Sequence, residues 1–127
     1  MNQMTNKVRI TWVDSSGTYP ESLKEMAVDS EFNFSFSSSV EALTESQLAA
    51  DMFVVYIDTT VRPIENLLSA ASRVSAKPII IARVARQSFE LAVSAMDLGV
   101  ATIIAAEEIE GEVWKARLEA LKPYYPN

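Results

Sequence analysis

The chain has 127 residues, 49% of them hydrophobic and 22% charged, a length and composition that favour one soluble domain with a sizeable core. Its formal net charge is −6 and nothing in the sequence concentrates Lys or Arg, so direct nucleic-acid binding, which requires phosphate neutralisation, is not expected. The chain has no Cys and no His, which excludes disulfides, thiolate nucleophiles, Cys/His zinc sites and imidazole acid–base catalysis.

The N-terminal quarter predicts one strand followed by one helix. Val8–Val13 alternates and is rich in β-branched residues, which is typical of a strand. After a loop that begins at Asp14, residues 18–21 form a capping-box pattern with Pro in the first turn of a helix. The apolar residues of this helix have helical spacing and are Leu23, Met26 and Ala27.

The next stretch predicts two strands with a helix between them. Phe32, Phe34 and Phe36 alternate with polar residues, which indicates a strand with one buried face. Ser39 is placed to cap a helix, whose apolar residues are Ala42, Leu43 and Leu48. Met52–Ile57 is continuously apolar, as expected for a central parallel strand that is covered on both faces.

A helix and a strand follow in the third quarter. Pro63 can open the helix, because Pro is tolerated in a first turn. The apolar stripe of this helix consists of Ile64, Leu67, Leu68, Ala71 and Val74. Pro78–Ala82 predicts the fourth strand, with Pro at the first position where it costs no ladder hydrogen bond.

The last quarter predicts two further helices around a fifth strand. The first of these helices ends at Gly99, a plausible C′ residue, and its apolar stripe consists of Phe89, Ala92, Val93 and Met96. Thr102–Ala105 is the fifth strand. The final helix starts at about Ile109 and ends before Pro123, with the apolar residues Val113, Trp114, Ala116, Leu118 and Leu121.

Five strand–helix alternations predict an α/β domain with a parallel sheet and helices on both faces. Right-handed crossovers leave few topologies, and the flavodoxin-like (βα)5 order 2-1-3-4-5 is the commonest for five units. In this order the first and third strands are neighbours, so Asp14 and Asp58 are predicted to lie side by side at the carboxyl ends of their strands.

This pattern resembles the receiver domain of two-component response regulators over nearly the whole chain. Residues 1–127 are therefore interpreted as a single receiver-like domain, with residues 122–127 as a tail or the start of a linker. The segment Lys77–Ala82 and the stretch from Ala92 to Gly99 are similar to the second half of the family in both spacing and residue type.

The resemblance assigns the acidic pocket and the phosphoacceptor position. The family's acidic pair falls on Asp14 and Ser15, so one carboxylate of the pair is absent. The acceptor position falls on Asp58, which ends the apolar third strand. An alignment anchored on Pro63 would place Thr59 there instead, because the family usually has Pro four residues after the acceptor.

The other positions of the family's site are replaced. The Ser/Thr switch position falls on Arg83, and the Lys position falls on Ala106. The aromatic residue of the fifth strand, which changes rotamer on activation in the family, falls on Ile103. The resemblance therefore implies a receiver without its usual phosphoryl clamp and without the residues that report phosphorylation.

These replacements weaken the expected magnesium site. Phosphoryl transfer to Asp requires Mg²⁺, which prefers carboxylate oxygens, and the only candidate ligands left are Asp14 and Asp58. Arg83 could supply a counter-charge by folding onto Asp58. The sequence thus predicts a pseudo-receiver that needs no cofactor; the alternative is a phosphorylatable receiver that takes phosphate on Asp58 from a histidine kinase.

The expected mode of action is docking through the fourth helix, fifth strand and fifth helix. This surface would form a homodimer or contact an output domain, plausibly of a transcription regulator. Its exposed candidates carry charges of both signs and are Arg86, Glu90, Asp97, Glu112, Lys115 and Glu119.

The same residues also bear on other functions and on the location of the protein. The hydroxyl-rich segment 15–18 could hold a phosphate, which leaves a flavin or nucleotide binder as a further alternative. No complete acid–base or nucleophile set is present, so an enzyme is not expected. No apolar run approaches the roughly 20 residues of a membrane span and no secretory signal is visible, so a cytoplasmic protein is expected.

Overall fold

The sheet of the computed structural model consists of five parallel strands in the order β2-β1-β3-β4-β5, as predicted. The structure describes residues 8–15, 32–74, 78–85, 88–108 and 110–121. The strands are β1 (Val8–Val13), β2 (Phe32–Ser37), β3 (Met52–Ile57), β4 (Ile79–Val84) and β5 (Thr102–Ala105).

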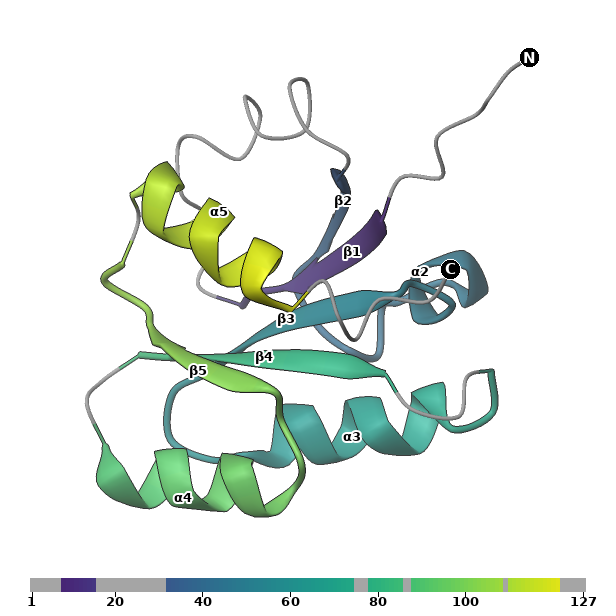
Figure 1. Ribbon diagram of the computed structural model, residues 1–127. Coiled ribbons are helices and arrows are strands. Elements are labelled where there is room, and N and C mark those ends of the chain that lie inside the picture. The colour runs from purple at the N-terminus through teal and green to yellow at the C-terminus, as the bar shows by residue number, and fades with distance from the viewer. Residues whose placement is uncertain (1–7, 16–31, 75–77, 86–87, 109, 122–127) are drawn as a thin grey trace.

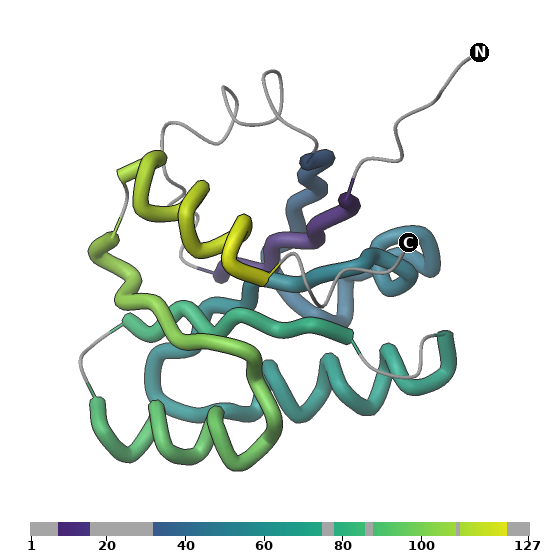
Figure 2. Tube along the Cα trace, in the orientation of Figure 1, coloured from purple at the N-terminus to yellow at the C-terminus, as the bar shows by residue number. Residues whose placement is uncertain are grey.

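Helices cover both faces of this sheet. The described helices are α2 (Glu45–Leu48), α3 (Arg62–Ala71), α4 (Phe89–Asp97) and α5 (Gly111–Ala120). Figure 1 shows α3 and α4 below the sheet and α5 above it. The trace in Figure 2 runs from β3 through α3 to β4 and through α4 to β5 on one face, then returns over the other face in α5. Among the described residues, no helix is long and apolar enough to cross a bilayer.

The two faces of the sheet bury two separate apolar clusters, as the alternation of side chains along each strand requires. One cluster lies against α3 and α4 and includes Phe53, Val55 and Leu67. The other lies under α5 and is centred on Trp12 and Trp114, whose rings are 5.0 Å apart between centroids. This second cluster continues along the strands to the carboxyl ends, where the polar site begins.

Several element bounds differ from the prediction. The second helix is one turn, Glu45–Leu48, because Thr44 and Gln47 form the capping box, whereas the hydroxyl of Ser39 only accepts from the amide of Ala42 in a preceding turn. Strand β4 begins after Pro78 and continues to Val84. Val74 lies beyond the end of α3 and is exposed.

Several predicted segments lie wholly or partly outside the described residues. They are the helix predicted from the pattern at residues 18–21, the hydroxyl-rich segment 15–18 beyond Ser15, the tail at 122–127, and the start of the last helix at Ile109. The described part of that helix begins at Gly111, and its buried residues are Trp114 and Leu118. The predicted member Ala116 is exposed.

The predicted buried face of α4 is wrong. Phe89, Val93 and Met96 are 82%, 41% and 53% exposed. Ala95 is the buried residue of the helix, and Leu91 and Leu98 pack beside it against the cluster under the sheet. Both sets have helical spacing, so periodicity alone cannot tell which one faces the sheet.

Gly99 ends α4 with a φ of +93°, a conformation that L residues with a Cβ rarely adopt. Replacing Gly99 by Ala is expected to lower the free energy of unfolding by about 1–2 kcal/mol through backbone strain, since a Cβ there would meet no neighbouring atom within 4 Å. Urea unfolding measures the loss. Gly99→Asn is the matched control, because Asn tolerates this region better; an equal loss in both variants would contradict a backbone origin.

Candidate functional site

The predicted site residues gather at the carboxyl ends of the parallel strands. Asp14 follows β1, Asp58 follows β3 and Ala106 follows β5, while Arg83 is the penultimate residue of β4. Parallel strands end at the same edge of a sheet, so these residues share one edge. The structure divides them into a buried ion pair and an exposed carboxylate.

The buried part is an ion pair between Arg83 and Asp14. Both side chains are at most 1% exposed. Nη1 of Arg83 donates to Oδ2 of Asp14, and Nη2 donates to the carbonyl oxygen of Ala106 at 3.0 Å. Nε1 of Trp12 also donates to Oδ2 of Asp14, at 3.4 Å. One guanidinium therefore connects the ends of β1 and β4 with the residue after β5.

Two aromatic rings flank this guanidinium. Cζ of Arg83 lies 5.8 Å from the ring centroid of Trp12 and 5.8 Å from that of Tyr56. The register explains the contact with Tyr56, because Tyr56 is paired with Arg83 across β3 and β4. Arg is suited to this environment, since its flat cation stacks on rings and donates in fixed directions.

The neutralising partner of Arg83 is Asp14 and not Asp58, which corrects the predicted pairing. Val13 is paired with Val55, so Asp14 lies level with Tyr56 and Asp58 lies two residues farther along the strand direction. Strands β1 and β3 are neighbours as predicted, but the two carboxylates are staggered. Asp14 is buried beside the cation, whereas Asp58 is exposed.

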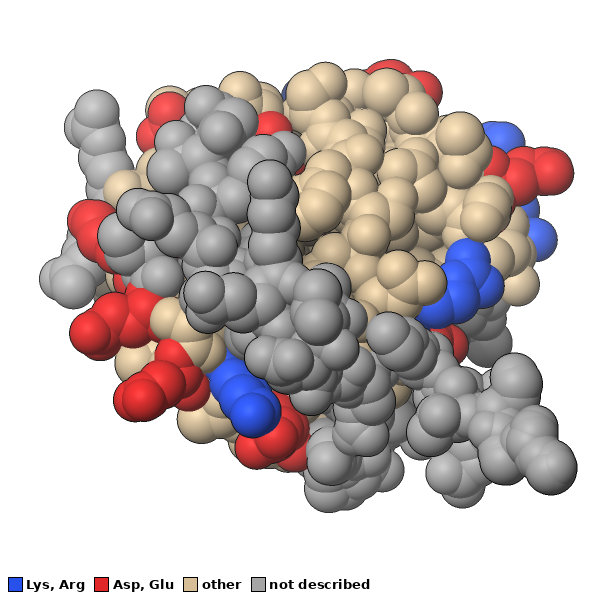
Figure 3. Space-filling view, turned by 90° about the horizontal axis from the view of Figure 1, so that it is seen from above, with Lys and Arg blue, Asp and Glu red and all other residues tan. Residues whose placement is uncertain are grey.

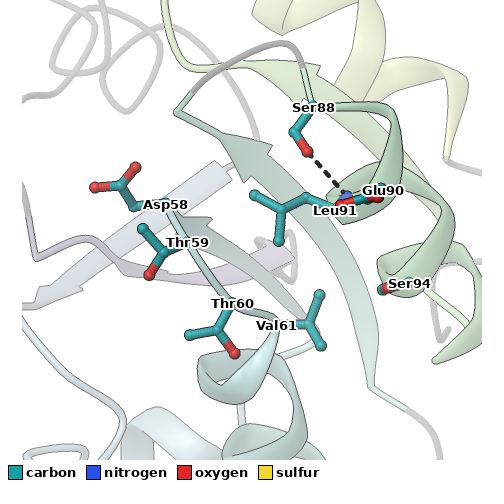
Figure 4. Close-up of a pocket in the computed structure, with 8 residues that line it drawn as sticks. All are labelled: Asp58, Thr59, Thr60, Val61, Ser88, Glu90, Leu91 and Ser94. Carbon is teal, nitrogen blue, oxygen red and sulfur yellow. Dashed lines mark hydrogen bonds between the residues drawn. The ribbon is translucent and has the colours of Figure 1, made fainter.

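Asp58 lines an open cavity of about 560 Å³ between the loop after β3 and the start of α4. Its other lining residues are mostly hydroxyl-bearing or acidic, and they are Thr59, Thr60, Val61, Ser88, Glu90, Leu91 and Ser94. Figure 4 shows the carboxylate of Asp58 pointing away from the α4 side of this cavity. The hydroxyl of Ser88 caps α4 by accepting from the amide of Leu91 at 3.2 Å.

The remaining predicted positions lie around this edge. Ser15 is exposed in the turn after Asp14 and lines a second cavity, of about 230 Å³, with Tyr56 and Arg62. Ile103 is half-buried and packs against the cluster on the α3 and α4 face. Ala106 takes part through its carbonyl oxygen.

The described members of the predicted docking surface are all exposed: Glu90, Asp97, Glu112, Lys115 and Glu119. Arg86 lies outside the described residues. Figure 3 shows acidic side chains gathered at the left of the face seen from above, on the side where Figure 1 places the start of α5.

A metal ion would find few ligands here. No group of three or more acidic residues that could hold an ion occurs in the described ranges. Asp14, the first candidate ligand, accepts from Arg83 and from the indole of Trp12. Asp58 remains the accessible carboxylate at this edge, with the hydroxyls of Thr59 and Thr60 beside it.

Trp12 and Tyr56 belong to the site, because their rings flank the guanidinium of Arg83, although neither was predicted as a site residue. The sequence holds a signal for Trp12, because residues two apart in a strand share a face and Trp12 is two residues before Asp14. Tyr56 required the β3–β4 register, which one sequence does not provide. Nothing in the sequence pointed to Ser88 or Ser94.

A scan against models of known protein families gives no match, and a sequence search of curated proteins gives none either. Among solved structures, the chain is similar to a response regulator receiver domain protein (CheY-like) from Methanospirillum hungatei JF-1. The TM-score is 0.70 at 14% identity, over 90% of this chain and 92% of that chain.

Two further structures show the same architecture. The N-terminal domain of an uncharacterized protein from Wolinella succinogenes matches with a TM-score of 0.68 and 16% identity, over 93% of this chain and 95% of that one. A provisionally assigned CpaE2 pilus assembly protein from Sinorhizobium meliloti 1021 matches with a TM-score of 0.62 and 13% identity, over 87% of this chain and 96% of that one. The chain therefore has the CheY-like receiver fold that the sequence resemblance implied.

Replacing Arg83 by Met is expected to lower the free energy of unfolding by about 3–5 kcal/mol, because it removes the cation from a buried pair and leaves the carboxylate of Asp14 behind. Urea unfolding followed by Trp fluorescence measures the loss. Arg73→Met, at an exposed cation, is the matched control and is expected to change the value by no more than about 0.5 kcal/mol.

The double variant Arg83→Met with Asp14→Asn separates pairing from packing. If the pair is the cause, the double variant loses less than the sum of the two single losses, with a coupling of about 1 kcal/mol or more. Strictly additive losses would show that the ion pair contributes nothing specific to stability.

Proposed function

We propose that this chain is a receiver-like signalling domain whose output does not depend on aspartyl phosphorylation. The observation that carries the proposal is the buried ion pair of Arg83 and Asp14. In this pair, the guanidinium of Arg83 binds Asp14, the one carboxylate at the position of the family's acidic pair. A cation of the protein itself therefore lies in the crevice. The receiver fold supports a signalling role, and the site chemistry supports the independence from phosphate.

The first step of the argument concerns magnesium. Transfer of a phosphoryl group to a carboxylate requires a divalent ion that offsets charge on the transferred oxygens. To bind such an ion, Asp14 would have to leave Arg83, and separating a buried pair costs about 3–5 kcal/mol. Ser15, at the position of the second acid, offers only a hydroxyl. The guanidinium thus competes directly with the metal.

The second step concerns the response to a phosphoryl group. Ala106 has no ammonium group to hold it, and Ile103 has no ring to change rotamer. Arg83 stands where a mobile hydroxyl would be expected, yet it is 1% exposed and held by Asp14, Ala106 and two rings. A buried side chain with that many partners is poorly suited to move as a switch.

The domain would then act as a docking module, for an output domain or for a second copy. The surface of α4, β5 and α5 supports this, because it presents exposed charges of both signs on α5 and acids on α4. Control of a transcription regulator is one such output. No turnover is proposed, since the described residues at this edge form no acid–base pair or activated nucleophile.

Phosphorylation of Asp58 is the second candidate, and one observation favours it. Asp58 is exposed at the carboxyl end of the central strand β3 and lines an open cavity that a small phosphodonor could enter. A histidine kinase would be the partner in that case. The absence of a second acid and of the Lys makes this the weaker interpretation.

Incubation with Mg²⁺ and acetyl phosphate, or with Mg²⁺ and beryllofluoride, distinguishes the two. The proposed function predicts no saturable change in Trp fluorescence or in amide NMR shifts, because Arg83 already occupies the crevice beside Trp12. A receiver with an intact acidic pair and Lys serves as the positive control for the reagents. A saturable response that disappears in Asp58→Asn would overturn the proposal in favour of a phosphorylated receiver.

A further inference from the structure

Helix α4 exposes an apolar stripe that the fold does not use. Five large hydrophobic residues are exposed in the described part of the chain, and three of them, Phe89, Val93 and Met96, lie on this helix. Their spacing of four and three residues places them on one face, opposite the residues that pack against the sheet. Grouped apolar exposure of this kind marks an interaction surface.

Acidic side chains flank this stripe. Glu90 is exposed beside Phe89 and lines the cavity of about 560 Å³ between α4 and the loop after β3. Asp97 lies seven residues, or two turns, after Glu90 and is exposed on the same flank of the helix. Residues 88–108 contain no Lys or Arg. Helix α4 itself therefore carries two acids and no cation.

A second copy of the chain fits this surface poorly. In an antiparallel two-fold pair of α4 helices, the flank that carries Glu90 and Asp97 would face the same flank of its mate and repel it. The exposed parts of three side chains also amount to a few hundred Å², whereas a stable dimer buries about 800 Å² on each partner. The stripe matches the size of one helix.

We propose that α4 binds a cationic amphipathic helix of a partner protein. The apolar face of that helix packs on Phe89, Val93 and Met96, and its Lys or Arg side chains bind Glu90 and Asp97 on the flank of α4. Charge and shape both select this occupant: an acidic helix would be repelled, and a purely apolar segment would leave the two carboxylates without counter-charge.

This inference rests on the proposed function only in taking the domain as a docking module. It adds the chemical class of the partner. The carboxylates of Glu90 and Asp97 would bind the partner's cations at the edge of the interface, where a charge-assisted hydrogen bond is strong. The hydroxyls of Ser88 and Ser94, which line the cavity beside Glu90, can accept further hydrogen bonds from an ammonium or guanidinium group.

The test uses a fluorescent 18-residue Leu/Lys peptide with apolar residues at helical spacing, titrated against the whole chain by anisotropy without Mg²⁺ or phosphodonor. Saturable binding with a Kd on the order of 10 μM is expected, and Phe89→Ser should weaken it at least about tenfold. Glu90→Gln with Asp97→Asn should weaken it several-fold and reduce its dependence on salt.

Matched controls separate this site from general attraction between an acidic protein and a basic peptide. Val74→Ser removes an exposed apolar residue outside α4, and Glu119→Gln with Glu112→Gln removes the same charge from α5. Both should leave Kd within about twofold of the unmodified chain, and a Leu/Glu peptide of the same pattern should not bind. Equal effects of Phe89→Ser and Val74→Ser, or equal binding of the acidic peptide, would overturn the proposal.

Two other outcomes are also decisive. If sedimentation shows a dimer that Phe89→Ser dissociates, while the Leu/Lys peptide does not bind, the stripe belongs to a second copy and the proposal is wrong. If the peptide binds only after addition of Mg²⁺ and beryllofluoride, the docking site is supported and independence from phosphate is wrong. Absence of binding with an inert response to phosphodonor refutes the docking site alone.

Discussion

The buried contact between Arg83 and Asp14 determines what this crevice can do. A guanidinium removed from water requires compensation for its lost hydration, and here a carboxylate, a backbone carbonyl and two aromatic rings contribute to it. These partners come from β1, β3 and the residue after β5, so the cation fixes four strand ends relative to one another. The crevice therefore contains a counter-charge supplied by the protein itself.

The contact also separates the roles of the two aspartates. Asp14 is inside the protein, where its charge serves the internal pair, and Asp58 is outside, where its charge acts on whatever approaches the domain. The stagger of two residues between them follows from the register of β1 and β3. Arg83, level with Tyr56, therefore reaches Asp14, and the electrostatic character of the outer cavity is left to Asp58 and Glu90.

The sequence predicts most of the sheet and only part of the site. β1, β3 and β5 have their predicted bounds, because β-branched residues favour strands and a continuous apolar run indicates a strand that is buried on both faces. The strand order followed from chain connectivity. The partner of Arg83 could not be chosen from the sequence, since both aspartates end neighbouring strands and only the register puts one of them within reach.

The orientation of α4 was unpredictable for a related reason. Phe89, Val93 and Met96 are larger than the residues that face the sheet, so hydrophobicity favours burying them. The small side chain of Ala95 instead lets the helix approach β4 closely, with Leu91 and Leu98 packed at its sides. A helix with apolar residues on both faces buries all of its apolar surface only when a second molecule or element packs on the face that points away from the sheet. The outer strip of α4, where apolar surface meets the carboxylates of Glu90 and Asp97, is therefore the surface that a partner would cover in the proposed docking.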